Sequence, residues 1–303
     1  YYCMSKKYYG MQTEKAIKNF PFSFRATSKE FIYAIAEIKK AAAGAHRLAG
    51  ELDSARALSI SKACDEVSSG KFDDQFVLPS FQGGAGTSNH MNVNEVIASR
   101  ATEILKNKSV VHPNDHVNMS HSTNDVMPSA LKITAVRLAD SVLASTDILI
   151  SALEKKAREF KTILKLGRTH MQDAVPITLG SEFAAYAEYV KRGKRRIVNA
   201  RRELLELNLG GSAVGNSINV SSRYQKNLYR ELRRVTKLKV FPGKNLMSQT
   251  SSNSDFVVIS QALTAFCIDL SKIAGDFRIL SSGPKGGFGE IILPELQAGS
   301  SIM

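Results

Sequence analysis

The sequence contains no tryptophan, few cysteines and no long apolar run. Cys3, Cys64 and Cys267 are odd in number and widely spaced, which argues against a disulfide framework and against a cysteine metal site. Such usage is typical of reduced thiols in a cytoplasmic protein, the location we expect. Apolar stretches fall short of the roughly 18 residues of a membrane span, and the first ten residues lack the apolar core of a signal peptide. We therefore expect no membrane partner.

The composition is that of an ordinary globular protein with a large core. The chain has 303 residues, of which 43% are hydrophobic and 23% charged, enough for one to three domains. Its net charge of +13 could favour nucleic acid, an anionic membrane or small anionic substrates. The densest basic cluster, at 191–202, lies within a helical pattern and is interpreted as a solvated face. Because no nucleic-acid motif accompanies it, we expect no nucleic-acid partner and a background that favours anions.

Apolar periodicity predicts a nearly all-helical protein. Residues recur at steps of three and four over 31–50, 54–68, 127–163, 179–207 and 256–280, and a further helix is expected at about 92–106. The last three patterns keep a 3.5-residue repeat over several heptads, which indicates near-parallel packing in an elongated bundle. The best strand candidate is short, at 237–241. Small and serine-rich helix faces suggest close subunit packing, so we expect a homo-oligomer.

Two polar strings in the first half of the chain are candidates for ligand contact. The first, 83–92 (GGAGTSNHMN), places Thr87 and Ser88 near a helix start, where free N–H groups favour an anion; simple helix capping is the alternative. The second, 112–125, is too polar for a core. Capping and Asx turns explain Asn124 and Asp125, whereas ligand contact and capping remain open for Ser122 and Thr123. A metal site built from its three histidines is disfavoured by their spacing.

Two further strings lie in the second half. In 167–176 (GRTHMQDAVP), we expect Asp173 to cap a helix that Pro176 opens, with Thr169 and His170 just before the cap. His170, between polar neighbours, is a candidate anion partner or proton carrier, although a lone histidine is usually structural. The string 293–301 (LPELQAGSS) ends in two hydroxyls and could equally be a flexible loop.

Together the four strings, in this order, resemble the fumarase/aspartase superfamily over nearly the whole chain, from 8–13 (YYGMQT) to 300–303 (SSIM). Residues 82–88 (QGGAGTS) and 293–299 (LPELQAG) are most similar to the aspartate ammonia-lyases of that superfamily. The resemblance implies an all-α homotetramer with a central twenty-helix bundle and active sites shared by three subunits. The predicted domains are an N-terminal, mainly helical domain at 1–110 and a long-helix bundle domain at 111–303, with the C-terminal domain outside the printed chain.

The resemblance also implies the roles of individual residues. Ser300 matches the general base and His170 is a second catalytic candidate. Positions that hold the substrate carboxylates and amino group are matched by Thr87, Ser122, Thr123, Asn124 and Thr169, and Ser301 is a further substrate-binding candidate. The implied reaction removes the C3 proton of L-aspartate, passes through an enediolate dianion stabilised by hydroxyls and helix amides, and releases ammonia and fumarate. A dicarboxylate is the expected small-molecule partner, with no cofactor and no metal.

The resemblance has gaps. A lysine and an asparagine expected soon after the SSIM string fall beyond Met303; we expect them in residues outside the printed chain, because the chain ends within the predicted catalytic loop. His90 stands where asparagine is usual, His121 where glutamine is usual, and 215–219 reads GNSIN in place of GTGIN. Class II fumarase is the alternative activity, and a catalytically silent structural member is a third hypothesis.

Overall fold

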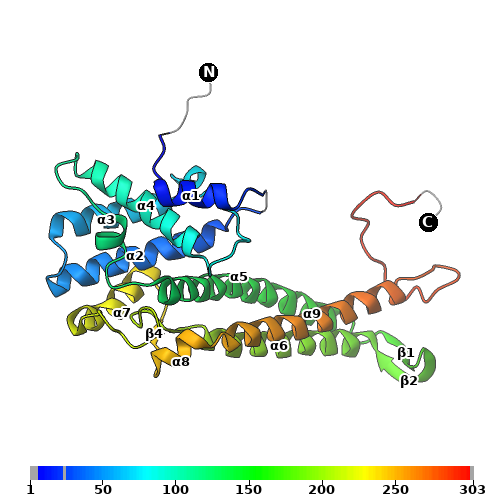
Figure 1. Ribbon diagram of the computed structural model, residues 1–303. Coiled ribbons are helices and arrows are strands. Elements are labelled where there is room, and N and C mark those ends of the chain that lie inside the picture. The colour runs from blue at the N-terminus through cyan, green and yellow to red at the C-terminus, as the bar shows by residue number, and fades with distance from the viewer. Residues whose placement is uncertain (1–5, 23–24, 301–303) are drawn as a thin grey trace. The chain divides into compact units, whose positions relative to one another are not determined.

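The computed structural model in Figure 1 describes residues 6–22 and 25–300. They group into two compact units, each assembled from separate parts of the chain: Tyr1–Leu138 with Arg201–Phe256, and Ala139–Ala200 with Val257–Met303. Three long helices, α5 (Thr123–Glu159), α6 (Leu179–Glu203) and α9 (Ser254–Leu280), contribute residues to both units. The predicted domain boundary near residue 110 divides the chain differently and stays a prediction.

The first unit is helical with one short pair of parallel strands. Besides the start of α5, the end of α6 and the start of α9, it contains α1 (Met11–Asn19), α2 (Lys29–Ala49), α3 (Ser54–Ser68), η1 (Asp73–Gln75), α4 (Thr87–Ile104), η2 (Pro113–Val117), β3 (Glu206–Leu207), α7 (Ser222–Thr236), β4 (Phe241–Pro242) and α8 (Leu246–Ser251). β3 pairs with β4 in parallel.

The core of the first unit is arranged around α2. This helix is rich in alanine, and it packs against both α3 and α7. Of its predicted apolar face, Ile35, Ile38, Ala42 and Ala45 are buried, whereas Leu48, near the C-terminal end, is half exposed. Small side chains let neighbouring helices approach closely, so α2 can be buried on several sides.

Local capping explains where these helices begin and end. The Ser28 side chain accepts a hydrogen bond from the Phe31 N–H at the start of α2, and Gly50, with φ of 76°, ends that helix in the left-handed conformation. Asp53 caps α3 in the same way. The predicted helix 54–68 therefore matches the observed bounds, because Gly50 and Asp53 mark both sides of the turn.

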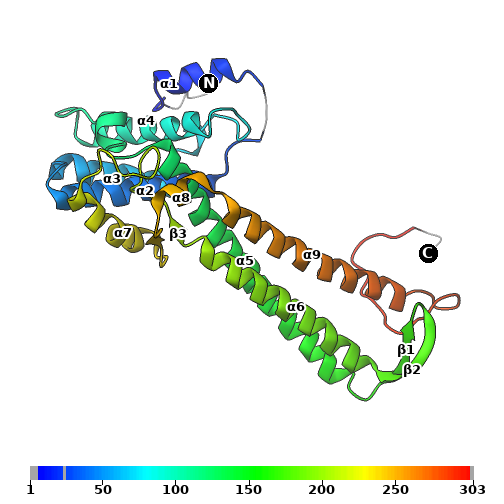
Figure 2. The same cartoon turned by 60° about the horizontal axis from the view of Figure 1, so that its bottom comes forward.

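The second unit is a bundle of three long helix segments. Residues of α5 and α9 pack with α6 (Leu179–Glu203), as Figures 1 and 2 both show. The predicted α6 stripe is buried from Leu179 to Ala200. At Gly193 a Cβ atom would lie only 2.3 Å from the Phe266 ring, so a residue without a side chain is needed where α6 meets α9. The periodicity that predicted long packed helices is confirmed.

A hairpin that the sequence analysis did not predict joins α5 to α6. β1 (Leu164–Thr169) and β2 (Gln172–Thr178) are antiparallel, and α6 begins only at Leu179. The expectation that Asp173 caps a helix opened by Pro176 is wrong: both residues lie in β2, and the Thr178 hydroxyl accepts the Ser181 N–H at the true helix start. Pro176 is tolerated because it lies beside the irregularity between Leu166 and Arg168.

Three other expectations need correction. α1, α7 and α8 were not predicted. In α7 the buried side chains recur mainly at every fourth residue, and most of the others are polar or basic, so the apolar face is narrow. The strand expected at 237–241 is mostly absent, because Lys237 instead ends α7 with φ of 61° and only Phe241 enters β4. α4 begins about five residues, and α5 about four residues, before the predicted start. The all-α fold class itself is confirmed by the element content.

One helix of the described part of the chain, α9, is long and apolar enough to cross a membrane by length and composition alone. The expectation that no apolar stretch reaches the length of a membrane span is therefore corrected for this helix. Only 22% of its most apolar window is buried within the chain. Ile268 and Val257 are more than half exposed on it. Its composition is also that of a bundle helix whose remaining faces meet further helices.

Candidate active site

The first unit contains a cavity of about 940 Å³. Its lining comes from four stretches that are distant in sequence: 27–31, 80–89, 123–138 and 250–256. Thr123 and Asn124 line it directly. Thr87 and Ser122 are the chain neighbours of the lining residues Gly86 and Thr123. The fold of the first unit therefore brings the first two polar strings to one cavity.

The glycine-rich string turns sharply and then starts α4. Gly84 and Gly86 both have φ of 82°, a conformation that glycine adopts at little cost. A Cβ atom on Gly86 would lie 2.6 Å from the Cε atom of Met127, so the loop packs directly on the first turns of α5, just after the second string. The Thr87 hydroxyl donates to the Gly84 carbonyl at 2.8 Å, which stabilises the turn. Thr87 is thus at a helix start, as predicted.

The start of α5 is held by a buried carboxylate. Asp125 is fully buried, and its two oxygens accept hydrogen bonds from the backbone N–H groups of Ser122, Gly210 and Ser212. Burial raises the pKa of Asp125, and the three N–H groups offset part of that rise. The capping interpretation of Asp125 is thereby confirmed, and the same bonds fasten the 210–212 loop beneath Ser122.

Pro128 has a specific consequence in this helix. It lies inside the first turns of α5 and has no N–H group, so it cannot donate to the carbonyl of Asn124, four residues earlier. The side-chain amide of the buried Asn208 donates to that carbonyl instead, at 2.9 Å. The Asn124 amide in turn donates to the Ala213 carbonyl at 2.8 Å. Asn124 is therefore fixed on both its backbone and its side chain.

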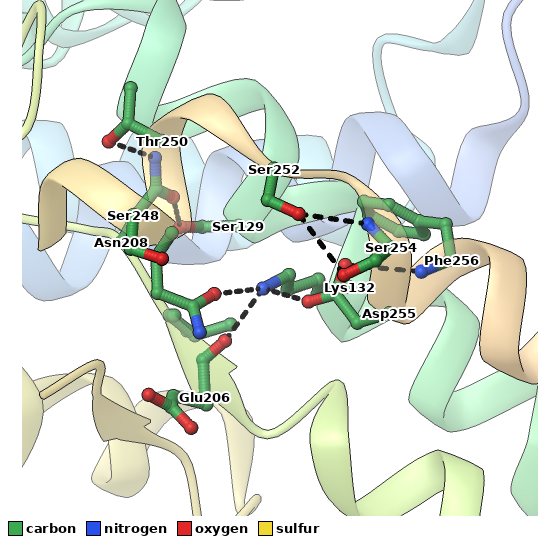
Figure 3. Close-up of polar contacts among 12 residues, drawn as sticks. Ser129, Lys132, Glu206, Asn208, Ser248, Thr250, Ser252, Ser254, Asp255 and Phe256 are labelled. Carbon is green, nitrogen blue, oxygen red and sulfur yellow. Dashed lines mark hydrogen bonds and ion pairs between the residues drawn. The ribbon is translucent and has the colours of Figure 1, made fainter. Parts of the chain in front are cut away.

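A polar network supports this wall from behind. In Figure 3, Asn208 accepts a hydrogen bond from Ser129 and donates one to Thr250, which itself lines the cavity. Beside it the buried Lys132 forms an ion pair with Asp255 and donates to the Glu206 carbonyl at 2.8 Å. A further bond reaches the Gln249 side chain at 2.8 Å. This cation therefore joins α5 to β3, α8 and the start of α9.

A second buried network lies behind Thr123. The Nδ1 atom of His90 on α4 is 3.0 Å from the Thr123 hydroxyl. Lys39 on α2 is fully buried and donates to Asn118 at 2.7 Å, while His121 Nδ1 lies 3.2 Å from the same ammonium group. His121 Nε2 is 2.7 Å from the Tyr224 hydroxyl. Burial lowers the pKa of Lys39 to about 7, with the charge of Asp125 opposing that shift.

The third string lies at the tip of the hairpin in the second unit. His170 and Met171 form the two-residue turn between β1 and β2, with φ of 50° and 63°. Two positive φ values are the signature of a type I′ hairpin turn, here made without glycine. Thr169, the last residue of β1, and His170 are both exposed within this chain. The hydroxyl of Thr169 and the imidazole of His170 are therefore exposed at a turn whose backbone is fixed by the pairing of β1 with β2.

Ion pairs connect β1 to the segment that carries the fourth string. Glu290 accepts from Arg168 at 2.5 Å and from Lys165 at 2.6 Å, and the Arg168 guanidinium lies 4.0 Å from the centre of the Phe288 ring. Burial pushes the pKa of Glu290 upward, but the hydrogen bonds from Arg168 and Lys165 outweigh it and leave the pKa lowered. Ser300 is exposed on this segment, and Ser301 lies outside the described residues.

The predicted residues that the structure describes are divided between the two units. Thr87, Ser122, Thr123 and Asn124 belong to the first unit, and Thr169, His170 and Ser300 to the second. In the described ranges no group of three or more His, Cys, Asp and Glu side chains could hold a metal ion. Asn208 and the lining residues at 250–256 were not predicted; the polar run 248–255 was the signal available for the latter.

Comparison with known proteins decides the family. The lyase family model matches residues 2–303. The chain belongs to this lyase family. It is 42% identical to an aspartate ammonia-lyase of Bacillus subtilis (strain 168) over 300 residues, which cover 98% of the chain and 63% of that relative. It is also 42% identical to a class II fumarate hydratase of Campylobacter jejuni, covering 98% of the chain and 65% of that relative.

A solved structure agrees with this assignment. The fumarate lyase:delta crystallin of Brucella melitensis superimposes with a TM-score of 0.94 at 43% identity, covering 98% of the chain and 66% of that structure. The resemblance to the fumarase/aspartase superfamily is confirmed. The chain spans slightly less than two thirds of the length of the curated relatives it matches. The two relatives carry different activities at equal identity, so overall similarity does not choose between them.

Proposed function

We propose that this chain is part of a lyase that eliminates a small group from a four-carbon dicarboxylate to give fumarate, and that the substrate is L-aspartate. The observation that carries the proposal is the cavity at which the starts of α4 and α5 meet, lined by Thr123 and Asn124. N-terminal amides of helices and hydroxyl groups are suited to bind a carboxylate. The family membership makes a dicarboxylate the anion of choice.

In the proposed reaction Ser300 acts as an oxyanion base. Its Oγ removes the C3 proton of L-aspartate, and the electron pair of that C–H bond moves into the neighbouring carboxylate to give an enediolate dianion. The C2–N bond then breaks, the C2–C3 double bond forms, and ammonia leaves with fumarate as the product. The Asn124 amide and the N-terminal N–H groups of the helices would stabilise the added charge, which is greatest in the intermediate. The Thr123 hydroxyl would bind the substrate carboxylate whose charge does not change.

The second candidate is hydration of fumarate to L-malate, favoured by the equal identity to a class II fumarase. In the reverse direction the same base would remove the C3 proton of malate to give the corresponding enediolate, and the C2 hydroxyl would take up a proton from solvent and leave as water. Hydration of fumarate runs these steps backwards. We rank the release of ammonia from aspartate first because the strings 82–88 and 293–299 are most similar to those of aspartate ammonia-lyases.

The experiment uses the full-length protein. Formation of fumarate from L-aspartate is followed by ultraviolet absorbance, and malate is offered separately. We expect fumarate from aspartate and a loss of at least about 100-fold in kcat for Ser300→Ala, because the proton acceptor is removed. If the protein converts malate to fumarate but does not convert aspartate, its activity is that of a fumarase. No turnover of either substrate would leave the silent structural role and reject the proposal.

We also propose that the protein assembles as a homotetramer with shared sites. Apolar side chains are exposed on both long helices of the second unit: Ile148 on α5 is 74% exposed and Ile268 on α9 is 65% exposed. Exposed apolar stripes of this kind mark helix–helix interfaces. Sedimentation of the full-length protein should give four chains, and Ile268→Glu should shift it toward smaller species. A wild-type monomer would contradict this proposal.

A further inference from the structure

His90 is placed to act on a group that faces the cavity. It lies on α4, and its ring is 1% exposed. Its Nδ1 atom contacts the hydroxyl of Thr123 at 3.0 Å, and Thr123 lines the cavity. His90 itself does not line the cavity, so it can reach a bound ligand only through Thr123.

The ring is uncharged. Burial lowers the pKa of His90 well below its usual value, and the positive charge of Lys39 lowers it further. A neutral imidazole carries one N–H group, on either nitrogen. His90 therefore either donates to the Thr123 oxygen from Nδ1 or accepts the Thr123 hydroxyl hydrogen there.

The environment of the other nitrogen favours donation from Nδ1. Nε2 of His90 is buried and has no hydrogen-bond partner within the described residues. A proton on Nε2 would leave a buried N–H donor unpaired, whereas a proton on Nδ1 leaves only an unpaired acceptor. Orphaned buried N–H groups are the rarer of the two in proteins. The hydrogen between the two side chains thus belongs to His90.

We propose that His90 is a positioning residue that donates its Nδ1 hydrogen to Thr123 and so turns the Thr123 hydroxyl hydrogen toward the carboxylate of a dicarboxylate substrate. A threonine that donated to His90 could offer that carboxylate only lone pairs, which would repel it. This inference rests on the proposed function for the identity of the ligand. The direction of the hydrogen bond does not rest on it.

The kinetic test is a double-mutant cycle in the full-length protein. His90→Phe keeps a ring and removes the N–H group; we expect KM for aspartate to rise roughly 10-fold with kcat changed less than about 3-fold, since a hydrogen bond to a charged ligand is weakened. In a Thr123→Val background the same change should leave KM unaltered. His90→Gln, whose amide can donate, should recover part of the loss. An equal rise in both backgrounds, or no recovery with glutamine, overturns the proposal.

His46→Phe is the matched control. It makes the same change in another buried ring, which pairs with Glu51 at 2.7 Å and does not contact Thr123. We expect a lower Tm with KM within about 2-fold of wild type. A rise in KM equal to that of His90→Phe would show that loss of any buried histidine suffices, which contradicts a specific role.

The tautomer can be measured without activity. Nitrogen-15 NMR of histidine-labelled protein, with His90→Phe to assign the signal, should show the proton on Nδ1 and a bare Nε2. A proton on Nε2 would refute the inference even if turnover is normal. If the protein turns over neither substrate but the Nδ1 proton is seen, the proposed function fails while the hydrogen-bond direction stands.

Discussion

The two units present their candidate residues in different ways. In the first, Thr123 and Asn124 lie at the start of α5. The polar residues around them, Asp125, Asn208 and Lys132, are buried and hydrogen-bonded. In the second, Thr169 and His170 are exposed at a hairpin tip, and Ser300 is exposed on a segment that follows a partly exposed ion-pair network. The candidate residues of the first unit are therefore held in place by buried hydrogen bonds.

The difference teaches where precision comes from. Buried polar groups hold a side chain in one position because every alternative leaves a donor or acceptor unpaired. Exposed side chains are restricted less, because water can replace a lost partner. We infer that the first unit provides a preorganised binding wall, whereas the second presents its candidate groups on the surface of the chain. Four changes test this comparison, in order of expected effect.

The largest effect is expected for Lys132→Met. It leaves Asp255 partly buried without its cation, which should lower the free energy of unfolding by about 4 kcal/mol. Denaturant unfolding of the full-length protein measures it. Lys156→Met, which breaks an exposed pair with Glu159, should cost less than about 1 kcal/mol. Equal costs for the two variants would remove the contrast between buried and exposed networks.

Asp125→Ala should come next. It removes the acceptor of three backbone N–H groups around the start of α5, and we expect a loss of about 3 kcal/mol in the same unfolding measurement. The exposed Asp173→Ala in β2 serves as control and should change stability by less than about 0.5 kcal/mol. A small effect at Asp125 would mean that water replaces it.

Lys39 provides a test by pH. Its pKa in the folded protein, about 7, lies below the ordinary lysine value of 10.5, so between these two pH values the unfolded chain binds more protons than the folded one. The stability of the wild type relative to Lys39→Met should therefore rise as the pH increases from 7 to 8, by at most about 1.4 kcal/mol. A flat or falling difference in Tm would contradict a buried lysine with a depressed pKa.

The smallest effect is expected in the second unit. Glu290→Gln should weaken the pairs with Arg168 and Lys165 and cost about 1 kcal/mol or less, because these groups are partly solvated. Since the pKa of Glu290 is lowered on folding, its contribution is present above its unfolded value of about 4.5 and is lost as the pH falls through the folded value. Hydrogen exchange over 281–300 should be faster in the variant. Unchanged exchange would show that the pairs do not order this segment.

Much of the fold follows from patterns along the chain. Long heptad-like stripes such as that from Leu179 to Ala200 predicted α6 and its buried face, because a helix must cover a continuous apolar stripe. The hairpin β1–β2 was missed because Pro176 and Asp173 also suit a helix start. Residues 172–178 form a strand because they pair with residues 164–169. The turn between the two segments lacks glycine, the usual sign of a hairpin in a sequence.

The candidate site divides in the same manner. Types and spacing in the strings 83–92 and 112–125 pointed to Thr87, Ser122, Thr123 and Asn124, because small hydroxyl and amide groups beside helix starts suit an anion. Nothing local in those strings indicates that Asn208 completes the hydrogen bond that Pro128 omits. That contact joins residues 84 positions apart, and only packing brings them together.

The sequence by itself determined the all-helical class, the family and the hydroxyl-bearing strings, since these depend on periodicity and on short runs of residue types. Tertiary structure alone decided which buried partners hold those strings: Asp125 against the 210–212 loop, Lys132 against Asp255, and His90 against Thr123. The physical reason is that a buried polar group is stabilised by the donors and acceptors around it, and those come from distant parts of the chain.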